Sequence, residues 1–257
     1  MNKKNYISLA NKAANLQINE LKKIKKAFNY SFIKAVDLIL NCKGKVIFAG
    51  IGKSGLIARK ISATFSSVGI PSFFCDPAQA LHGDMGQIEK RDILIVFSYS
   101  GNTSELTNML RYANRYRIKI IGVASKPDSI LLKASDIKLI LPKVKEADLT
   151  GMVPTSSTSI TLLLGDCLAT TVMHQKKFSK ENFKVFHPGG NIGKSLLLAK
   201  DIMVSGKKMP TINYKKNFKD ALKIMNQKKL GIVVILKNKF IKGLLTDGDL
   251  RLSLIHI

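Results

Sequence analysis

The sequence predicts an α/β fold: a three-layer αβα sandwich around a five-stranded, mostly parallel sheet. Between Lys45 and Pro142, short apolar runs alternate with segments whose apolar residues recur at helical spacing. The apolar runs are continuous rather than alternating, which is typical of strands buried on both faces. Glycine- or hydroxyl-rich turns open several of the helical segments, so these turns are expected together at the edge where parallel strands end.

Residues 6–40 carry apolar side chains at three- and four-residue steps, which predicts an amphipathic segment of two helices. We expect residues 1–44 to pack on the sheet domain, although a helical segment of this length also suits contact with another subunit. Strands are expected at 45–50, 71–75, 92–98, 118–125 and 136–141. Helices are expected at 54–68, 103–116 and 128–135, and a long apolar helix from Ile160 to His174.

The chain has 257 residues, of which 46% are hydrophobic, enough for one full domain and a smaller unit. A formal charge of +25 suggests nucleic-acid binding, but the lysines are spread along the chain with few aromatics between them. We therefore expect no nucleic-acid partner; attraction of phosphorylated metabolites fits the same charge.

The composition also bears on localisation and thiol chemistry. No apolar run reaches the roughly 18 residues of a membrane span, and the first residues lack the apolar core of a signal peptide. A cytoplasmic protein without a membrane partner is expected. Cys42, Cys75 and Cys167 lack metal-ligand spacing and are interpreted as reduced thiols.

The turn from Gly50 to Gly55 follows the first strand and opens a helix. Such a turn points backbone N–H groups and a helix N-terminus at an anion, to which Lys53 adds a positive charge and Ser54 a hydroxyl. Its Gly-x-Gly-x-x-Gly spacing also matches the dinucleotide fingerprint, with Asp76 in the place of the ribose-binding acid. By itself the turn is also compatible with a dinucleotide site, or with a tight strand-to-helix turn that binds no ligand.

Two further turns repeat this arrangement with hydroxyls in place of lysine. The turn from Ser98 to Glu105 follows a buried strand, and residues 154–159, PTSSTS, lead into the long apolar helix. Each has more hydroxyls than helix capping requires. Three such turns at one edge of a sheet predict a phosphorylated ligand.

Five residues are candidates for chemistry. Glu105 and Glu146 stand in or beside the hydroxyl turns, where a bound phosphate would raise the carboxyl pKa and make either a base. An ordinary surface position is the alternative for each. His187 lies in a Pro- and Gly-rich loop, and His82 in another loop. The fifth candidate is Lys53.

Together these segments resemble a sugar isomerase (SIS) domain, and more closely the arabinose-5-phosphate isomerase family, over about residues 45–200. The motifs that carry the resemblance are GIGKSG (50–55), SFFCDPAQALHGDMG (72–86), SYSGNTSE (98–105), KEA (145–147), PTSSTS (154–159) and HPGGNIGKSLL (187–197). The resemblance implies interconversion of D-ribulose 5-phosphate and D-arabinose 5-phosphate, the first step toward the 3-deoxy-octulosonate sugar of lipopolysaccharide. It also implies a homotetramer without an organic cofactor.

The resemblance further implies roles for individual residues. Catalytic positions fall on Lys53, Glu105, Glu146 and His187, and His82 would contact the substrate. The phosphate cradle would consist of the hydroxyls of Ser54, Ser98, Ser100, Thr103, Ser156 and Ser157. We expect His187 to open the sugar ring and a carboxylate, Glu146 first and Glu105 second, to carry the proton. Lys53 would stabilise the developing oxyanion.

Two positions depart from the family pattern. Asp76 stands where many relatives carry a histidine associated with an inhibitory zinc, which argues against a metal ion at Asp76. Asn102 replaces the glutamate of the relatives' SGE turn, while Glu105 remains.

Residues 201–257 have a different pattern, with a helix expected at 217–229 and a strand at 232–236. They resemble the first of the paired CBS repeats that follow SIS domains in this family, and Thr246 and Asp249 would contact a nucleotide ribose. Because the sequence stops inside the helix that should follow, we expect a truncated, partial CBS domain without nucleotide regulation.

Two other function classes remain open. One is a non-catalytic sugar-phosphate sensor, and the other is a lyase or aminotransferase-type SIS enzyme. Sensors usually pair the domain with a DNA-binding helix-turn-helix, which the N-terminal segment does not show, and they have no need of Glu105, Glu146 and His187 together. The sequence also leaves open a related pentose or hexose phosphate as the substrate.

Overall fold

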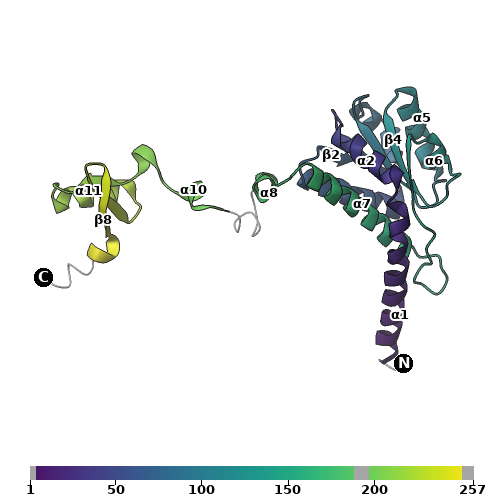
Figure 1. Ribbon diagram of the computed structural model, residues 1–257, viewed down its shortest axis with the longest axis horizontal. Helices are drawn as coiled ribbons and strands as arrows, with labels where there is room; N and C mark the ends of the chain where they lie inside the picture. The colour runs from purple at the N-terminus through teal and green to yellow at the C-terminus, as the bar shows by residue number, and fades with distance from the viewer. Residues whose placement is uncertain (1–3, 188–196, 251–257) are drawn as a thin grey trace. The chain divides into compact units, whose positions relative to one another are not determined.

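The computed structural model describes residues 4–187 and 197–250 (Figure 1). The chain divides into two compact units, residues 1–196 and 197–257, which are described separately. The helices of the first unit are α1 (Lys4–Leu21), α2 (Tyr30–Leu40), α3 (Gly52–Ser67), α4 (Pro77–Ala80), α5 (Thr107–Arg115), α6 (Ile130–Ala134), α7 (Ser156–Gln175) and α8 (Lys180–Phe186). Short 3-10 helices are η1 (Lys22–Ala27), η2 (Asp84–Gln87) and η3 (Ser104–Leu106).

The sheet of the first unit confirms the predicted fold class. Its strands are β1 (Val46–Gly50), β2 (Ser72–Phe74), β3 (Ile93–Phe97), β4 (Lys119–Ala124) and β5 (Ile137–Ile140). They pair in the order β2-β1-β3-β4-β5, and every pairing is parallel. Each strand begins one residue later than the sequence predicted, as expected where strand ends fray. The predicted helix at 103–116 begins as η3 and becomes α-helical at Thr107.

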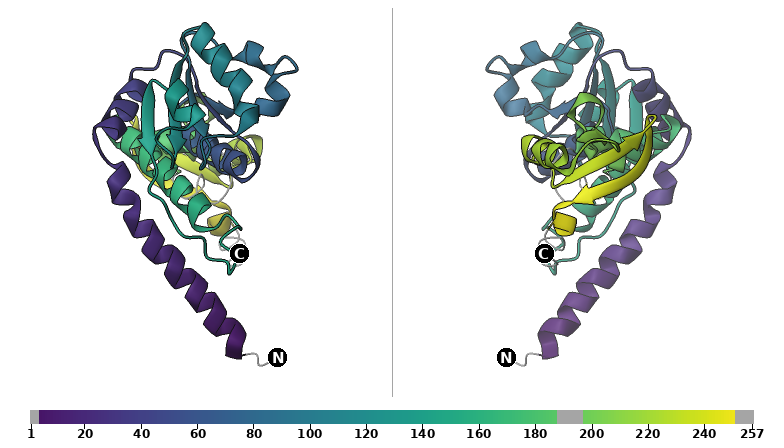
Figure 2. Two further views of the ribbon diagram at one scale, coloured as in Figure 1. Left: turned by 90° about the vertical axis from the view of Figure 1, so that its right-hand side faces the viewer. Right: turned by 90° about the vertical axis from the view of Figure 1, so that its left-hand side faces the viewer.

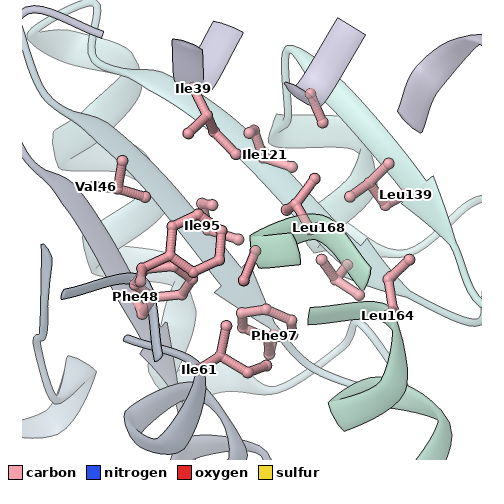
Figure 3. Packing of buried hydrophobic residues seen from close by; sticks show 14 of the residues in the cluster. Ile39, Val46, Phe48, Ile61, Ile95, Phe97, Ile121, Leu139, Leu164 and Leu168 are labelled. Carbon is pink, nitrogen blue, oxygen red and sulfur yellow. The ribbon is translucent and has the colours of Figure 1, made fainter. Parts of the chain in front are cut away.

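Strands β1 and β3 are buried along their whole length because helices cover both faces of the sheet. Successive side chains of a strand point to opposite faces, so Val46 and Phe48 pack with α2, α3 and α7, whereas Ile47 and Ala49 pack with α4, α5 and α6. Figure 3 shows the first of these clusters, in which Phe48 and Phe97 of neighbouring strands meet Ile61 of α3. The result is the three-layer sandwich.

Helices α3 and α7 approach each other closely on the first face. A Cβ atom at Gly165 of α7 would lie 2.2 Å from Cδ1 of Ile61 in α3. A larger residue at this position would therefore require the buried side chain of Ile61 to move. The crossing fixes the spacing of the two helices whose first turns reach the edge where the strands end.

Helix α1 extends beyond the other elements of the first unit for part of its length (Figure 2). Tyr6, Ile7 and Leu9 are exposed on that part, whereas the last turn of α1 buries Glu20. Its C-terminal half thus packs on the sandwich, in agreement with the predicted helical segment before the sheet.

The second unit contains α10 (Ala199–Ile202), η4 (Gly206–Lys208), β6 (Thr211–Asn213), α11 (Phe218–Lys228), β7 (Ile232–Lys237) and β8 (Phe240–Thr246). Strand β7 lies between β6, to which it is parallel, and β8, to which it is antiparallel. A small core joins α11 to this sheet; its buried members are Ile212, Ala221, Met225 and Val233. The predicted helix and strand are both present, and the end of the sequence, 251–257, lies outside the described residues.

None of the helices within 4–187 and 197–250 combines the length and the apolar character needed to cross a bilayer.

Candidate active site

A cavity of about 360 Å³ opens at the edge of the sheet where the strands end. It lies where the strand order reverses, between β1 and β3, which is the usual ligand site of such sheets. Its lining residues are Ile51, Lys53, Ser54, Ile57, Ser98, Tyr99, Ser100, Thr103, Glu146, Pro154, Ser157, Thr158 and Thr161. All three predicted turns contribute to it.

The turn between β1 and α3 brings Lys53 and Ser54 to the cavity. Gly52 has a φ of +57°, and a Cβ atom on Gly55 would lie 2.6 Å from the carbonyl oxygen of Gly50. These glycines let α3 begin directly at the end of β1. The first turn of the helix, with its unpaired N–H groups, therefore faces the ligand position.

The turn after β3 supplies Ser98, Ser100 and Thr103. The hydroxyls of Ser98 and Thr103 are 2.8 Å apart, and Ser98 Oγ also accepts the N–H of Gly101 at 3.0 Å. Asn102 does not line the cavity: its Oδ1 accepts the N–H of Ile130 at 3.0 Å and ties the turn to α6. The hydroxyls are thus held in place by the turn itself before any ligand binds.

The N-terminus of α7 forms a further wall and separates two neighbouring serines. Ser157 lines the cavity, whereas Ser156 is fully buried and does not line it. The Oγ atom of Ser156 has no hydrogen-bond partner within the described part of the chain.

Glu146 caps α7 from a loop that follows β5. Its Oε2 accepts the N–H of Thr155 at 2.8 Å, the hydroxyl of Thr155 at 2.9 Å and the N–H of Ser157 at 3.2 Å. A carboxylate at a helix N-terminus is stabilised by the unpaired N–H groups and the helix dipole. The hydrogen bonds that cap α7 therefore also hold Glu146 in the cavity wall.

The rise in pKa expected for a carboxyl beside a bound phosphate stays a prediction; without a ligand, two opposed effects act on the pKa of Glu146. Burial raises its pKa, but hydrogen bonds from Ser157 and Thr155 outweigh burial, and the pKa is lowered. The pKa of Glu105 is lowered as well, by a hydrogen bond from its own backbone N–H and one from the Ser104 hydroxyl. Both carboxylates are thus held in the ionised form in the absence of a ligand.

The match to known proteins is extensive. The family model of the SIS domain matches residues 39–171. A probable arabinose 5-phosphate isomerase of Haemophilus influenzae is 38% identical over 251 residues, covering 97% of this chain and 74% of that protein. The arabinose 5-phosphate isomerase KdsD of Escherichia coli K12 is 41% identical over 233 residues, covering 90% of this chain and 71% of KdsD.

The chain belongs to the arabinose 5-phosphate isomerase family of SIS-domain proteins. A solved structure of an Escherichia coli CFT073 protein in complex with arabinose 5-phosphate shares its fold, with a TM-score of 0.71 and 34% identity. That likeness covers 73% of this chain and all of the other. The resemblance inferred from the motifs is therefore confirmed for the family, while the CBS resemblance of the second unit stays a prediction.

Several residues implied by the arabinose 5-phosphate isomerase pattern lie outside the cavity wall. Glu105 is exposed and accepts the Ser104 hydroxyl at 2.8 Å. His82 is exposed in the loop after α4. Asp76 caps α4 by accepting the N–H of Ala78 at 2.9 Å, and it lines a separate hollow of about 450 Å³ beside Lys53.

His187 follows α8 and lies away from the cavity. Its ring stacks on Phe183 at 3.8 Å, and its Nδ1 is 2.9 Å from the carbonyl oxygen of Phe183. The neighbouring Phe186 packs at Gly69, just before β2 begins. In a parallel sheet this is the edge opposite the cavity. The rest of the HPGGNIGKSLL motif through Leu196 lies outside the described residues.

Side chains that could ligate a metal ion are dispersed over the part of the chain that the structure describes. Across residues 4–187 and 197–250, no three or more His, Cys, Asp or Glu side chains gather closely enough to hold one. The carboxylate of Asp76 is engaged as a helix cap instead. Asp76 therefore lies in no cluster of metal-ligating side chains within the described residues.

Motif reasoning missed several residues of the site. Tyr99 lines the cavity, and its hydroxyl accepts the N–H of Val144 at 2.9 Å and donates to the carbonyl oxygen of Pro142 at 3.3 Å. Its place directly after a buried strand, between two predicted serines, was the available signal. Thr158 and Thr161 also line the cavity; Thr158 lies within the third predicted turn.

In the second unit, Thr246 and Asp249 form a reciprocal cap. Oδ2 of Asp249 accepts the N–H and the hydroxyl of Thr246 at 2.9 and 2.8 Å. The hydroxyl of Thr246 accepts the N–H of Asp249 at 3.3 Å. The two predicted nucleotide contacts therefore lie side by side at the end of β8.

Proposed function

We propose that this protein is an aldose–ketose isomerase that interconverts D-ribulose 5-phosphate and D-arabinose 5-phosphate. The observation that carries the proposal is that Lys53, Glu146 and hydroxyls from three turns line one cavity at the end of a parallel sheet. One cavity thus offers hydroxyls for a phosphate dianion, a carboxylate to act as a base, and a positive charge. Family membership and the relative bound to arabinose 5-phosphate support the substrate class.

The phosphate would bind to the hydroxyls and helix N-termini of the cavity. Ser54 and Ser157 stand on the first turns of α3 and α7, and Ser98, Ser100 and Thr103 add hydroxyls from the turn after β3. Helix N-termini and hydroxyl donors both favour a phosphate dianion. Ser156 belongs to the cradle only if it turns toward the ligand, since its hydroxyl is buried away from the cavity here.

The reaction requires a proton to move between neighbouring carbons of the open-chain sugar. Glu146 would take the proton from C1 of ribulose 5-phosphate, and the electron pair of that C–H bond would form the enediolate with its negative charge on O2. Returning the proton to C2, while the O1 proton passes to O2, gives arabinose 5-phosphate. Lys53, across the same cavity, would stabilise the enediolate oxygen by its fixed charge.

The roles expected for the residues outside the cavity wall require loop movement or a second subunit. Glu105 and His82 would reach a bound sugar through movement of the loops that carry them. His187 would open the sugar ring in a cavity of another subunit, because in its own chain it lies beside the opposite edge of the sheet. We therefore propose an oligomer, as in the expected homotetramer. The exposed apolar side chains of α1, including Ile7, support such an assembly.

Nuclear magnetic resonance of the reaction tests the proposal. Incubation with ribulose 5-phosphate should yield arabinose 5-phosphate, and in deuterated water the product should carry deuterium on C2. Binding of arabinose 5-phosphate without turnover would instead identify a sensor, and cleavage products would identify a lyase. Conversion retained by a Glu146→Gln, Glu105→Gln double variant would contradict the assignment of the base.

The supply of product to 3-deoxy-octulosonate synthesis stays a prediction. So does ribose contact by Thr246 and Asp249, because the relation of the second unit to a CBS repeat rests on its motif alone.

A further inference from the structure

The loop that carries Glu146, residues 142–147, has no regular secondary structure. We call this loop the strap. Its backbone is held by side chains from three separate elements. The hydroxyl of Tyr99, after β3, accepts the N–H of Val144 at 2.9 Å. Thr155, before α7, accepts the N–H of Ala147 at 2.8 Å through its own hydroxyl.

The third support comes from α1, far away in the sequence. Oε2 of Glu20 accepts the N–H of Lys145 at 3.0 Å, across a separation of 125 residues. Glu20 is only 8% exposed, and its carboxylate also forms an ion pair with Lys23 at 2.5 Å. The supported amide belongs to the residue directly before Glu146.

The stability of α1 does not explain a carboxylate at this position. Glu20 lies in the last turn of α1, where the chain continues directly into η1, so its carboxylate caps none of the described helix ends. Its burial has a cost, because a buried carboxylate loses its water. Hydrogen bonds from Lys23 and from the N–H of Lys145 nevertheless lower the pKa of Glu20 despite burial. Glu20 is therefore an ionised group whose long-range contact is the strap.

We propose that Glu20 is a positioning residue for the isomerase reaction: it fixes the backbone before Glu146 so that the carboxylate of Glu146 faces the sugar at the right depth. The proposal rests on the proposed function. Helix α1 is itself tied to α7, since the hydroxyl of Ser159 donates to Oε1 of Gln17 at 3.3 Å. The helix that carries Glu20 is thus bonded to the helix whose N-terminus is capped by Glu146.

Misplacing a catalytic group by about 1 Å can cost about a hundredfold in rate. Glu20→Ala should therefore lower kcat about tenfold to hundredfold, while KM changes less than about threefold because the phosphate cradle is untouched. Glu20→Gln keeps an oxygen that accepts the N–H of Lys145 and should restore kcat to within about threefold of the original protein. Asn15→Ala, on the exposed side of the same helix, is the matched control.

Hydrogen exchange followed by mass spectrometry gives a readout that does not depend on activity. Amides of residues 142–147 should exchange faster in Glu20→Ala than in Asn15→Ala, with the strands of the sheet unchanged and Glu20→Gln close to the control. Faster exchange of the strap with unchanged kcat would overturn the proposal. So would equal losses of kcat in Glu20→Ala and Glu20→Gln, or unchanged exchange of the strap.

An unmodified protein that does not convert ribulose 5-phosphate would refute the proposed function instead. In that case the exchange of residues 142–147 would still decide whether Glu20 holds the strap.

Discussion

Oε2 of Glu146 accepts the backbone N–H of Thr155 at 2.8 Å, so the proposed base is also the cap of helix α7. The cap keeps the carboxylate ionised and fixes its direction. It also means that a substitution at Glu146 that removes the accepting oxygen would uncap the helix that carries part of the phosphate cradle.

Glu146→Gln should lower kcat about a hundredfold to ten-thousandfold, the usual contribution of a positioned base. The amide oxygen can still accept the N–H of Thr155, so the fold and phosphate binding should persist. Steady-state kinetics with ribulose 5-phosphate, together with inhibition by inorganic phosphate, measures both. Glu105→Gln, at an exposed carboxylate, should cost less; an equal loss would shift the assignment to Glu105.

The acid limb of the kcat/KM profile should lie below the usual pH range of a glutamate. The pKa of Glu146 is lowered, so the base stays ionised as the pH falls and activity is lost only when the pH passes that lowered value. Thr155→Val removes one donor to Glu146, together with the acceptor of the Ala147 N–H, and should move the acid limb to higher pH. Thr170→Val, on an exposed part of α7, should leave it in place.

Lys53→Met should lower kcat about a hundredfold to a thousandfold, as expected for loss of a preorganised charge at the oxyanion. Lys53→Arg keeps the charge but not its position and should retain part of the rate. Melting temperatures should be similar for both variants because Lys53 is exposed. A Lys53→Met variant with normal kcat and raised KM would place Lys53 in phosphate binding alone.

Ser157→Ala and Ser156→Ala should differ although the two residues are neighbours. Ser157 lines the cavity, so its loss should weaken binding of inorganic phosphate. Ser156 is buried without a hydrogen-bond partner in the described region, and removing an unsatisfied hydroxyl should leave the melting temperature equal or higher. Calorimetric titration with phosphate compares the two variants. Equal weakening of binding would return Ser156 to the cradle.

The loop after Glu146 should loosen in acid. Asp148 accepts the N–H and hydroxyl of Thr150 and the N–H groups of Met152 and Val153, and the Thr150 hydroxyl above all lowers its pKa to about 2. This stabilisation is complete above the ordinary pKa of 3.8 and is lost as the pH falls toward about 2. Amide exchange of residues 148–153, corrected for its intrinsic pH dependence, should rise through that window. Asp148→Ala should show the same loosening at neutral pH.

The sequence was sufficient for the fold and for those site residues whose signal is local. Ser98 directly follows β3, and Lys53 and Ser54 lie in the first turn of the helix that follows β1, so topology alone brings them to one edge. Glu146 lies in a loop without such a signal; its nearness to the hydroxyl turns made it a candidate, with a surface position as the alternative, and the family resemblance implied its catalytic role.

Other contacts could not be read from local pattern. Glu20 and Lys145 meet across 125 residues, and nothing near Glu20 marks it as different from a surface glutamate. The cluster PTSSTS predicted a hydroxyl wall but not that Ser157 faces the cavity while Ser156 is buried, because the rotation of the first helical turn depends on packing. The pKa of Glu146 is lowered without a ligand because of hydrogen-bond donors around the start of α7 that no local pattern reveals, while the rise expected beside a bound phosphate stays a prediction.

The missing side chain at Gly165 has a consequence for the whole cavity. Gly165 lies eight residues after Ser157, about 12 Å along α7, and neither it nor Ile61 lines the cavity. Yet it lies where α3 and α7 approach each other closely, and the first turns of the same two helices form walls of the cavity. A larger side chain at Gly165 is therefore expected to displace α3 or Ile61 and, through α3, to alter the cavity without touching the ligand.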